Sequence, residues 1–390
     1  MQNRPKIVLS ITSTFCLGFL RGQSKFLKEN GFDVYLFSPA GEGLIEYGES
    51  EDCNIVEIPY KREISLFSDL KCLILTLKHL HKIKPNIINV GTPKSGLIGV
   101  LAARILGIEN RIFTLRGLRS TAEPEGRTKR IVEFMEKFTH NCANYVISIT
   151  PSMASYAIEN DILDKKKTVV LAKASSNGIN VNKFTLEKDK FIIEELKQEF
   201  SIKENDFVIG FVGRVVKSKG VEEIYKAFSS LSVRYDNLKM LVIGPIEDTS
   251  DSISSNILKS METDKNVVFT GQRKDVDYLY HLMNVFSLPS HNFREGFGNV
   301  AMEASASGVP IVVSRGAGCQ DAVLDGETGI LVNPMSVEQL ENAFEFYINN
   351  KDIAVQHGAS GRKFATDFFK NEIVWNAQLE FYNRLINSTK

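Results

Sequence analysis

The sequence predicts two α/β domains, each built around a doubly wound parallel sheet. The chain has 390 residues, which is more than a single hydrophobic core usually serves. Short apolar runs alternate with stretches of helical periodicity from one end of the chain to the other. The same alternation starts again near residue 207, so we expect two sheets of similar size.

The apolar runs predict strands in both halves, with crossover helices between them. In the first half, strands are expected at residues 6–12, 33–38, 86–90, 111–115, 145–150 and 168–172. In the second half, they are expected at residues 207–212, 239–244, 266–270, 285–289 and 310–314.

A polar helical stretch at residues 187–200 marks the junction between the two predicted domains. It follows a turn at Asn177-Gly-Ile-Asn180 and precedes the second set of strands. We therefore expect a first domain at 1–185 and a second at 186–370. Residues 371–390 form an amphipathic segment, long enough to return to the first domain as a helix. The apolar residues that this helix would bury are Ile373, Trp375, Leu379, Phe381, Tyr382 and Leu385.

Composition excludes several classes of protein. Lys plus Arg and Asp plus Glu both number 47, so no net charge points to nucleic acid. The five cysteines are odd in number and form no Cys-x-x-Cys pair, which argues against a disulfide framework and a zinc site. No window supplies the roughly 20 uninterrupted apolar residues that span a bilayer, and no signal peptide is evident. We expect a cytoplasmic protein.

A glycine-flanked loop, Gly213-Arg-Val-Val-Lys-Ser-Lys-Gly220, directly follows the predicted strand at 207–212. It places Arg214 and Lys219 outside the carboxyl end of a parallel strand, where open α/β sheets bind ligands. These two cations would stabilise a diphosphate leaving group without a metal. An ordinary solvated basic loop is the alternative for this motif alone.

A second motif, Glu295-Gly-Phe-Gly-Asn-Val-Ala-Met-Glu303, predicts a glycine loop followed by a helix that begins near Asn299. The free amides and positive dipole of that helix start form an anion site. Glu303 would accept hydrogen bonds from both ribose hydroxyls, and Glu295 would reach hydroxyls of a donor sugar. The alternative is two unrelated carboxylates, but the small residues around Glu303 indicate close packing rather than a solvated face.

Together these motifs resemble the retaining glycosyltransferases of family four, which have the GT-B fold. The resemblance rests on Arg214 with Lys219, on the Glu-x7-Glu spacing of Glu295 and Glu303, and on Gly308-Val-Pro310. Further matches are Asn177-Gly178, Phe184, Leu241-Val-Ile-Gly244, Leu288-Pro-Ser290, Asp321-Ala-Val-Leu-Asp-Gly326 and Thr328-Gly-Ile-Leu-Val332. In the first half, Phe19-Leu-Arg-Gly-Gln23, Lys28-Glu-Asn-Gly31 and Leu115-Arg-Gly-Leu-Arg119 resemble bacterial members that build surface polysaccharides.

The resemblance implies two facing Rossmann-like domains and transfer of a hexosyl or N-acetylhexosaminyl group with retention of configuration. The expected donor is a UDP-sugar, and the expected acceptor is a saccharide, carried on a lipid, for capsular or other surface polysaccharide. The implied catalytic residues are Arg214, Lys219 and Glu295, and the implied donor-binding residues are Gly213, Phe297, Gly298, Asn299, Val300 and Glu303. No metal or other cofactor is expected. A UDP-sugar 2-epimerase of the same fold and a non-catalytic nucleotide-sugar-binding regulator remain alternatives.

The first half departs from the family in two places. Many relatives carry paired glycines after the first strand, which residues 12–18 lack. Many also carry a histidine near the acceptor, where this chain places Arg116, with Arg119 close by. A guanidinium can stabilise a diphosphate or an acceptor oxygen, but it cannot serve as a general base.

Three other sequence features are interpreted mainly as structural rather than catalytic. Asp275-Val-Asp277 matches a metal-binding pattern, but it opens a helix, so Asp275 is expected as an N-cap and Asp277 as a first-turn acid. His291 is expected either to line the donor pocket or to be an ordinary loop histidine. Residues 127–138 form a basic amphipathic helix that would suit anionic lipid, although an ordinary half-buried helix is favoured because four glutamates dilute its charge.

Overall fold

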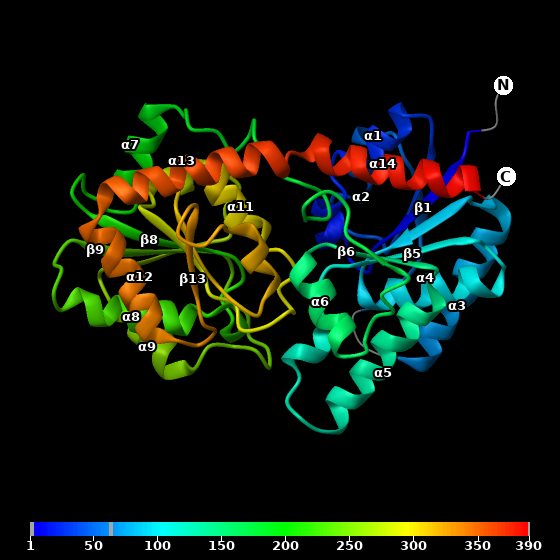
Figure 1. Ribbon diagram of the computed structural model, residues 1–390, viewed down its shortest axis with the longest axis horizontal. Helices are drawn as coiled ribbons and strands as arrows, with labels where there is room; N and C mark the ends of the chain where they lie inside the picture. The colour runs from blue at the N-terminus through cyan, green and yellow to red at the C-terminus, as the bar shows by residue number, and fades with distance from the viewer. Residues whose placement is uncertain (1–3, 62–64, 389–390) are drawn as a thin grey trace. The chain divides into compact units, whose positions relative to one another are not determined.

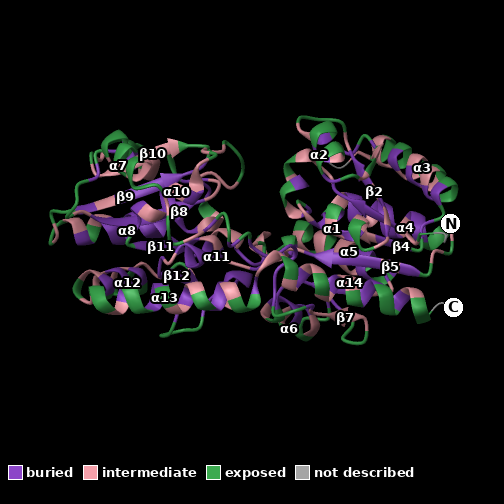
Figure 2. Ribbon diagram, turned by 90° about the horizontal axis from the view of Figure 1, so that it is seen from above, coloured by how far each residue is buried: buried purple, intermediate pink, exposed green. Residues whose placement is uncertain are grey.

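A computed structural model describes residues 4–61 and 65–388 of the chain. The chain forms two compact units (Figure 1). Unit 1 comprises residues 1–178 with 371–390, and unit 2 comprises residues 179–370. In both units the central strands are the most deeply buried elements, and the helices expose one face (Figure 2).

Within the described residues, unit 1 contains a seven-stranded sheet and the helices that connect its strands. The strands are β1 (Lys6–Ser10), β2 (Asp33–Ser38), β3 (Asn54–Glu57), β4 (Ile87–Val90), β5 (Asn110–Leu115), β6 (Tyr145–Ser148) and β7 (Thr168–Val169). The α-helices are α1 (Gln23–Glu29), α2 (Leu44–Ser50), α3 (Leu66–Ile83), α4 (Pro93–Ile105), α5 (Arg127–Cys142), α6 (Pro151–Glu159) and α14 (Asn371–Ser388). Two 3-10 helices are η1 (Thr14–Phe19) and η2 (Arg119–Ala122).

Unit 2 contains a six-stranded sheet. Its strands are β8 (Phe207–Val212), β9 (Leu238–Ile243), β10 (Val267–Gly271), β11 (Val285–Leu288), β12 (Ile311–Ser314) and β13 (Gly329–Val332). Its α-helices are α7 (Lys190–Glu199), α8 (Val221–Ser232), α9 (Ser255–Thr263), α10 (Val276–Leu279), α11 (Asn299–Ala306), α12 (Val337–Asn349) and α13 (Lys351–Phe368). The 3-10 helices are η3 (Lys217–Lys219), η4 (Tyr280–Leu282) and η5 (Gly318–Ala322).

Both sheets have the doubly wound topology that the sequence predicts. The strand order is β3-β2-β1-β4-β5-β6-β7 in unit 1 and β10-β9-β8-β11-β12-β13 in unit 2, with parallel pairing throughout. Central strands such as β8 are buried at every position, as a strand covered on both faces must be. The order reverses between β1 and β4 and between β8 and β11, so each unit has one topological switch point.

The eleven predicted strands are all present, but two further strands were not predicted. β3 and β13 lie at the edges of their sheets and have only four residues each. β3 is exposed at both ends, and Ile55 and Val56 are its only apolar residues, so its periodicity is weak. An edge strand is buried less than a central one, and its sequence carries correspondingly less of an apolar signal.

The division between the units lies at Gly178 and Ile179, whereas the sequence placed it at residues 185/186. The difference arises because residues 179–184 are held by the end of unit 2. The amide of Ile179 donates to the Phe369 carbonyl at 2.6 Å. The Arg362 guanidinium donates to the carbonyls of Val181 and Phe184.

The C-terminal helix α14 belongs to the core of unit 1. Its buried side chains recur at helical spacing, and they are Val374, Gln378, Phe381, Tyr382 and Leu385. Three of them pack with residues of β1, β2 and α1 in one apolar cluster. Among the residues that the structure describes, no helix is both long and apolar enough to cross a membrane.

Candidate functional site

The motifs of the second half meet at the switch point of unit 2. The loop at 213–220 leaves the carboxyl end of β8, and the loop at 289–298 leaves the carboxyl end of β11, which pairs with β8. Parallel strands end at the same edge of a sheet, so the two loops lie side by side. The amide of His291 donates to the Ser218 carbonyl at 3.0 Å and ties one loop to the other.

Arg214 follows β8 directly and forms an ion pair with Glu247. The distance from Nη1 of Arg214 to the Glu247 carboxylate is 2.7 Å, and both side chains are partly exposed. Gly213, before it, adopts a φ of 148° and donates its amide to the Ile243 carbonyl at 2.8 Å. The guanidinium therefore stands at the edge of the sheet, with an acid from the loop after β9 as its partner.

Lys219 ends the short helix η3 and forms an ion pair with Glu295. The structure therefore brings together two of the predicted catalytic residues. Burial and the nearby Arg214 guanidinium lower the pKa of Lys219 to about 8. The pair keeps the site close to neutral in the absence of ligand.

Asp251 fixes the position of η3, a role that the sequence did not reveal. Its carboxylate accepts from the Ser218 amide at 3.0 Å, from the Ser218 hydroxyl, and from the Arg294 guanidinium at 3.2 Å. Asp251 therefore ties Ser218, the neighbour of Lys219, to the loop that carries Glu295. Asp251 lies in a polar loop whose sequence carries no recognisable motif, so only the tertiary structure identifies it.

The start of α11 has the backbone geometry that the predicted anion site requires. Gly298 precedes the helix with a φ of 70°, a conformation that favours glycine. Gly318 packs so closely on this loop that a Cβ there would lie 1.4 Å from the Gly296 carbonyl oxygen. No hydrogen bond within the described residues uses the amides of Phe297 to Val300 as donors. These amides, with the helix dipole, are available to a negatively charged group.

Glu303 lies one turn into α11 and accepts a hydrogen bond from Tyr280. The distance from the Tyr280 hydroxyl to Oε2 of Glu303 is 3.1 Å, and the same hydroxyl is 3.0 Å from the Val300 carbonyl oxygen. Burial raises the pKa of Glu303 to about 7. Tyr280 is itself buried between the rings of Phe184 and Phe286, so no local pattern in the sequence signals its contact with Glu303.

The Phe297 side chain is part of the core and not of the ligand surface. It is 2% exposed, and its ring lies 5.1 Å from that of Phe369. Phe297 was predicted to bind the donor, but only its backbone is free to approach a ligand. Asn299 and Val300, the first two residues of α11, are partly exposed.

The predicted positions of Asp275 at the N-cap and of Asp277 in the first turn of α10 are confirmed. The Asp275 side chain makes no capping bond and instead pairs with Arg273 at 2.7 Å. Asp277 is 6% exposed and forms a buried ion pair with Lys188, and Lys183 lies 3.7 Å from the same carboxylate. Across residues 4–61 and 65–388, no group of three or more side chains suited to a metal ion occurs.

His291 contacts an acid that the sequence did not associate with it. Its Nε2 lies 3.2 Å from the Glu223 carboxylate, near the first turn of α8. Both side chains are largely buried, so the pair joins α8 to the loop after β11. His291 is thereby fixed within the same loop that carries Glu295.

The two predicted acceptor-side arginines lie in unit 1 and have different surroundings. Arg119 is largely exposed and pairs with Glu123 at 3.0 Å. Arg116 follows β5, and its Nη1 donates to the Gly91 carbonyl at 2.9 Å. The Phe19 ring lies 5.5 Å from its guanidinium carbon.

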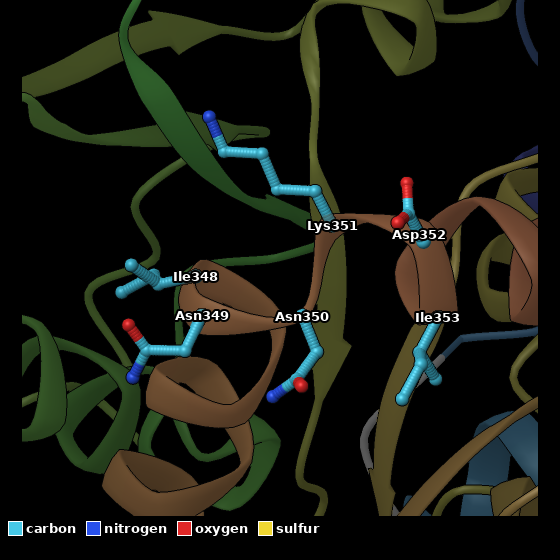
Figure 3. A pocket seen from close by; sticks show the side chains of 6 residues that line it. All are labelled: Ile348, Asn349, Asn350, Lys351, Asp352 and Ile353. Atoms are coloured by element: carbon cyan, nitrogen blue, oxygen red, sulfur yellow. The ribbon is translucent and has the colours of Figure 1, made fainter.

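A surface hollow of about 420 Å³ lies elsewhere in unit 2, at the junction of α12 and α13 (Figure 3). Figure 3 shows Lys351 and Asp352 pointing to one side of this junction and Asn350 and Ile353 to the other. Its polar groups therefore do not converge on a common point. None of the predicted site residues lines it.

Comparison with known protein families accounts for most of both halves of the chain. Residues 192–364 match the family described as glycosyl transferases group 1. Residues 6–150 match the family described as glycosyl transferase 4-like. Together these matches contain all of the predicted site residues.

Individual proteins resemble the chain over most or all of its length. The capsular polysaccharide biosynthesis glycosyltransferase CapM of Staphylococcus aureus is 37% identical over 100% of both chains. The UDP-Gal:alpha-D-GlcNAc-diphosphoundecaprenol alpha-1,3-galactosyltransferase of Escherichia coli is 25% identical, covering 88% of this chain and 87% of its own. The crystal structure of a glycosyltransferase from Rickettsia africae ESF-5 superimposes with a TM-score of 0.81 at 18% identity, covering 98% of this chain and 99% of that one.

Proposed function

Because this chain belongs to the glycosyl transferases group 1, we propose that it moves a sugar from a UDP-sugar to a saccharide acceptor carried on a lipid diphosphate. The product would be a bacterial surface polysaccharide. The observation that carries the proposal is the meeting of Arg214, Lys219 and the start of α11 at one switch point. That arrangement suits a diphosphate attached to a sugar.

The donor would bind along the edge of the sheet of unit 2. Glu303 accepts hydrogen bonds from the ribose hydroxyls, and the amides of Phe297 to Val300 receive phosphate oxygens and nearby hydroxyls. Glu295 turns from Lys219 to the hydroxyls of the donor sugar. This exchange frees Lys219 for the diphosphate and keeps both charged groups partnered.

Transfer would proceed with retention of configuration and without a metal. The bond between the anomeric carbon and the diphosphate breaks, the acceptor oxygen forms its bond on the same face of the sugar, and the proton of the acceptor hydroxyl passes to the departing diphosphate. Negative charge grows on the departing diphosphate, where Arg214 and Lys219 stabilise it. No cofactor enters this proposal, because the fixed cations and the α11 dipole supply the positive charge that a divalent ion supplies elsewhere.

The names of two relatives support the acceptor and the process. The Staphylococcus aureus protein acts in capsular polysaccharide biosynthesis, and the name of the Escherichia coli protein specifies a UDP-linked donor and a diphosphoundecaprenol acceptor. An acceptor of that kind is held in a membrane, so the enzyme would work in the cytoplasm at the membrane surface.

Helix α5 offers a surface for that contact. The helix buries Thr139, His140 and Cys142, but its apolar residues Ile131, Phe134 and Phe138 are 60%, 66% and 39% exposed. Arg127 and Arg130 are exposed beside them. Apolar residues flanked by arginines suit a membrane with anionic lipid. Phe134→Ser with Phe138→Ser should abolish sedimentation with phosphatidylglycerol vesicles, and unchanged sedimentation would exclude α5 as the contact.

The proposal is tested by incubating the full chain with radiolabelled UDP-sugars and a bacterial membrane extract. We expect label to enter the lipid-extractable fraction, with the α-anomeric configuration of the donor kept in the product. Conversion of the UDP-sugar without an acceptor would identify an epimerase. Binding of a UDP-sugar with neither reaction would identify a regulator.

The metal-free mechanism is tested separately. Transfer should continue in EDTA at an unchanged rate. Loss of transfer in EDTA with recovery on adding Mn²⁺ would overturn the proposed roles of Arg214 and Lys219.

A further inference from the structure

Arg116 lies beside the switch point of unit 1, one strand away from the two strands between which the order reverses. It follows β5, and its guanidinium reaches across to the end of β4, which pairs with β1. The guanidinium lies directly against Gly91, where a Cβ would approach Nη1 to 1.5 Å. Open α/β sheets bind ligands in the crevice at such a point.

No acidic residue compensates the charge of Arg116 in residues 4–61 and 65–388. Its Nη1 donates to the Gly91 carbonyl, but Nε is buried and has no hydrogen-bond partner there. Burial lowers the pKa of Arg116 to about 10. A buried cation without a carboxylate is costly, and it is retained where a ligand supplies the missing negative charge.

The surroundings of Arg116 add favourable polarity. Helix α4 begins two residues after Gly91, so its positive end faces the same corner of the sheet. Three hydroxyls lie in a chain there, with Thr12 Oγ1 2.6 Å from Thr92 Oγ1 and Thr92 Oγ1 2.7 Å from Ser95 Oγ. Because the Ser95 amide already donates to Thr12, α4 contributes its dipole and these hydroxyls rather than a row of free amides.

We propose that Arg116 is the centre of an anion-binding site in unit 1 that takes a phosphate or diphosphate group. The site is separate from the Arg214 and Lys219 cluster, which belongs to unit 2. The existence of the site does not depend on the proposed function. The source of the anion does rest on that function: the anion is the diphosphate either of the lipid-linked acceptor or of the nucleotide donor.

The test measures binding of inorganic pyrophosphate, UDP and farnesyl diphosphate to the full chain by calorimetry. To remove the site of unit 2 from the pyrophosphate measurement, both Arg214 and Lys219 are changed to Gln. In that background we expect Arg116→Gln to weaken pyrophosphate binding about tenfold or more, the loss of one charge-assisted contact. Arg116→Lys should restore part of the affinity.

The matched control is Arg111→Gln, at the other end of the same strand. Arg111 donates to the carbonyls of Cys142 and Ile108 and lies away from the switch point. Its replacement should leave pyrophosphate binding unchanged. Thermal unfolding of each variant checks that the chain remains folded.

With Arg214 and Lys219 intact, the other two probes identify the source. If Arg116→Gln weakens the binding of farnesyl diphosphate but not of UDP, the site takes the diphosphate of the acceptor. If it weakens the binding of UDP but not of farnesyl diphosphate, the site takes the diphosphate of the donor. Equal affinities of Arg116→Gln and its parent for all three probes would overturn the proposal. The proposal would also be overturned if Arg111→Gln weakened pyrophosphate binding as much as Arg116→Gln does. A chain that binds pyrophosphate through Arg116 but transfers no sugar would refute only the proposed function.

Discussion

The two switch points of this molecule have the same topology but opposite electrostatic arrangements. In unit 2, Arg214 and Lys219 are each paired with a carboxylate, from Glu247 and Glu295. In unit 1, Arg116 has no acidic partner among the described residues. The first arrangement is neutral until a ligand displaces an acid, whereas the second leaves a charge unpaired in the free protein.

This difference follows from the loops that surround each point. In unit 2 the loop after β9 supplies Glu247 and Asp251, and both reach the residues that follow β8. In unit 1 the neighbours of Arg116 are the Gly91 carbonyl, the Phe19 ring, the Cys16 thiol and the Tyr382 hydroxyl. A cation that is already paired must give up its carboxylate when the ligand binds. This exchange lowers the affinity for the ligand, but the carboxylate keeps the cation in place in the free protein.

The largest expected effect is on the chemical step in unit 2. Lys219→Ala should lower kcat by about 100-fold to 1,000-fold and change donor affinity much less, because charge on the leaving diphosphate grows in the transition state. Arg214→Ala should act in the same direction. Single-turnover kinetics measure the step, and Lys217→Ala, in the same helix η3, is the control. Equal losses in binding, with no loss in the chemical step, would mean that these cations only hold the ground state.

The next effect concerns stability, because Asp277 is held in a buried ion pair with Lys188. Asp277→Asn should lower the free energy of unfolding by about 3 kcal/mol, since it leaves the Lys188 ammonium buried without a counter-charge. Urea denaturation measures the change. The more exposed Asp275→Asn should cost under about 1 kcal/mol. Equal, small losses would restore the view of Asp277 as a helix-surface residue.

Glu303→Ala should weaken binding of the UDP-sugar by about 2 kcal/mol, because the ribose hydroxyls lose a charged acceptor. Calorimetry measures the affinity. The Tyr280 hydroxyl keeps the Val300 carbonyl as its acceptor, so the fold should survive. A folded variant with normal donor affinity would remove Glu303 from the site.

Donor affinity should depend on pH through the same residue. The pKa of Glu303 is raised to about 7, so the carboxylate fraction rises about tenfold between pH 6 and pH 8, and donor binding should tighten by a similar factor. The effect on folding has the opposite sign. A raised pKa stabilises the folded state below the unfolded value of 4.5, and this contribution is lost as pH rises through about 7. Glu303→Gln should flatten both profiles.

The smallest effect tests the exchange of partners in unit 2. Glu247→Gln removes the acid that competes for Arg214, so UDP should bind about threefold more tightly at low salt. The control is Glu341→Gln, because Glu341 pairs with Arg234 away from the predicted site. Weaker UDP binding in Glu247→Gln would mean that Glu247 orients Arg214 and does not compete for it.

The sequence predicted the parts of the molecule that depend on local patterns. Continuous apolar runs identified the central strands, and the glycines around Arg214 and Glu295 located both loops of the donor site. Glu247, Asp251 and Tyr280 were not predicted, because each acts through a partner 20 or more residues away. The burial of Asp277 was not predicted for the same reason, since its partner Lys188 is 89 residues away.

The return of α14 to unit 1 imposes an order on the folding of the two units during synthesis. The core of unit 1 includes Phe381, Tyr382 and Leu385 of α14, although the rest of that unit ends at Gly178. On a ribosome, unit 1 therefore stays incomplete until α14 has been made, which happens only after the whole of unit 2 has been translated. Until then the apolar surface of unit 1 that α14 covers would be exposed, and a chaperone or rapid elongation would be needed to protect it. A nascent chain stalled after Lys370 should be digested by protease in unit 1 and resist in unit 2.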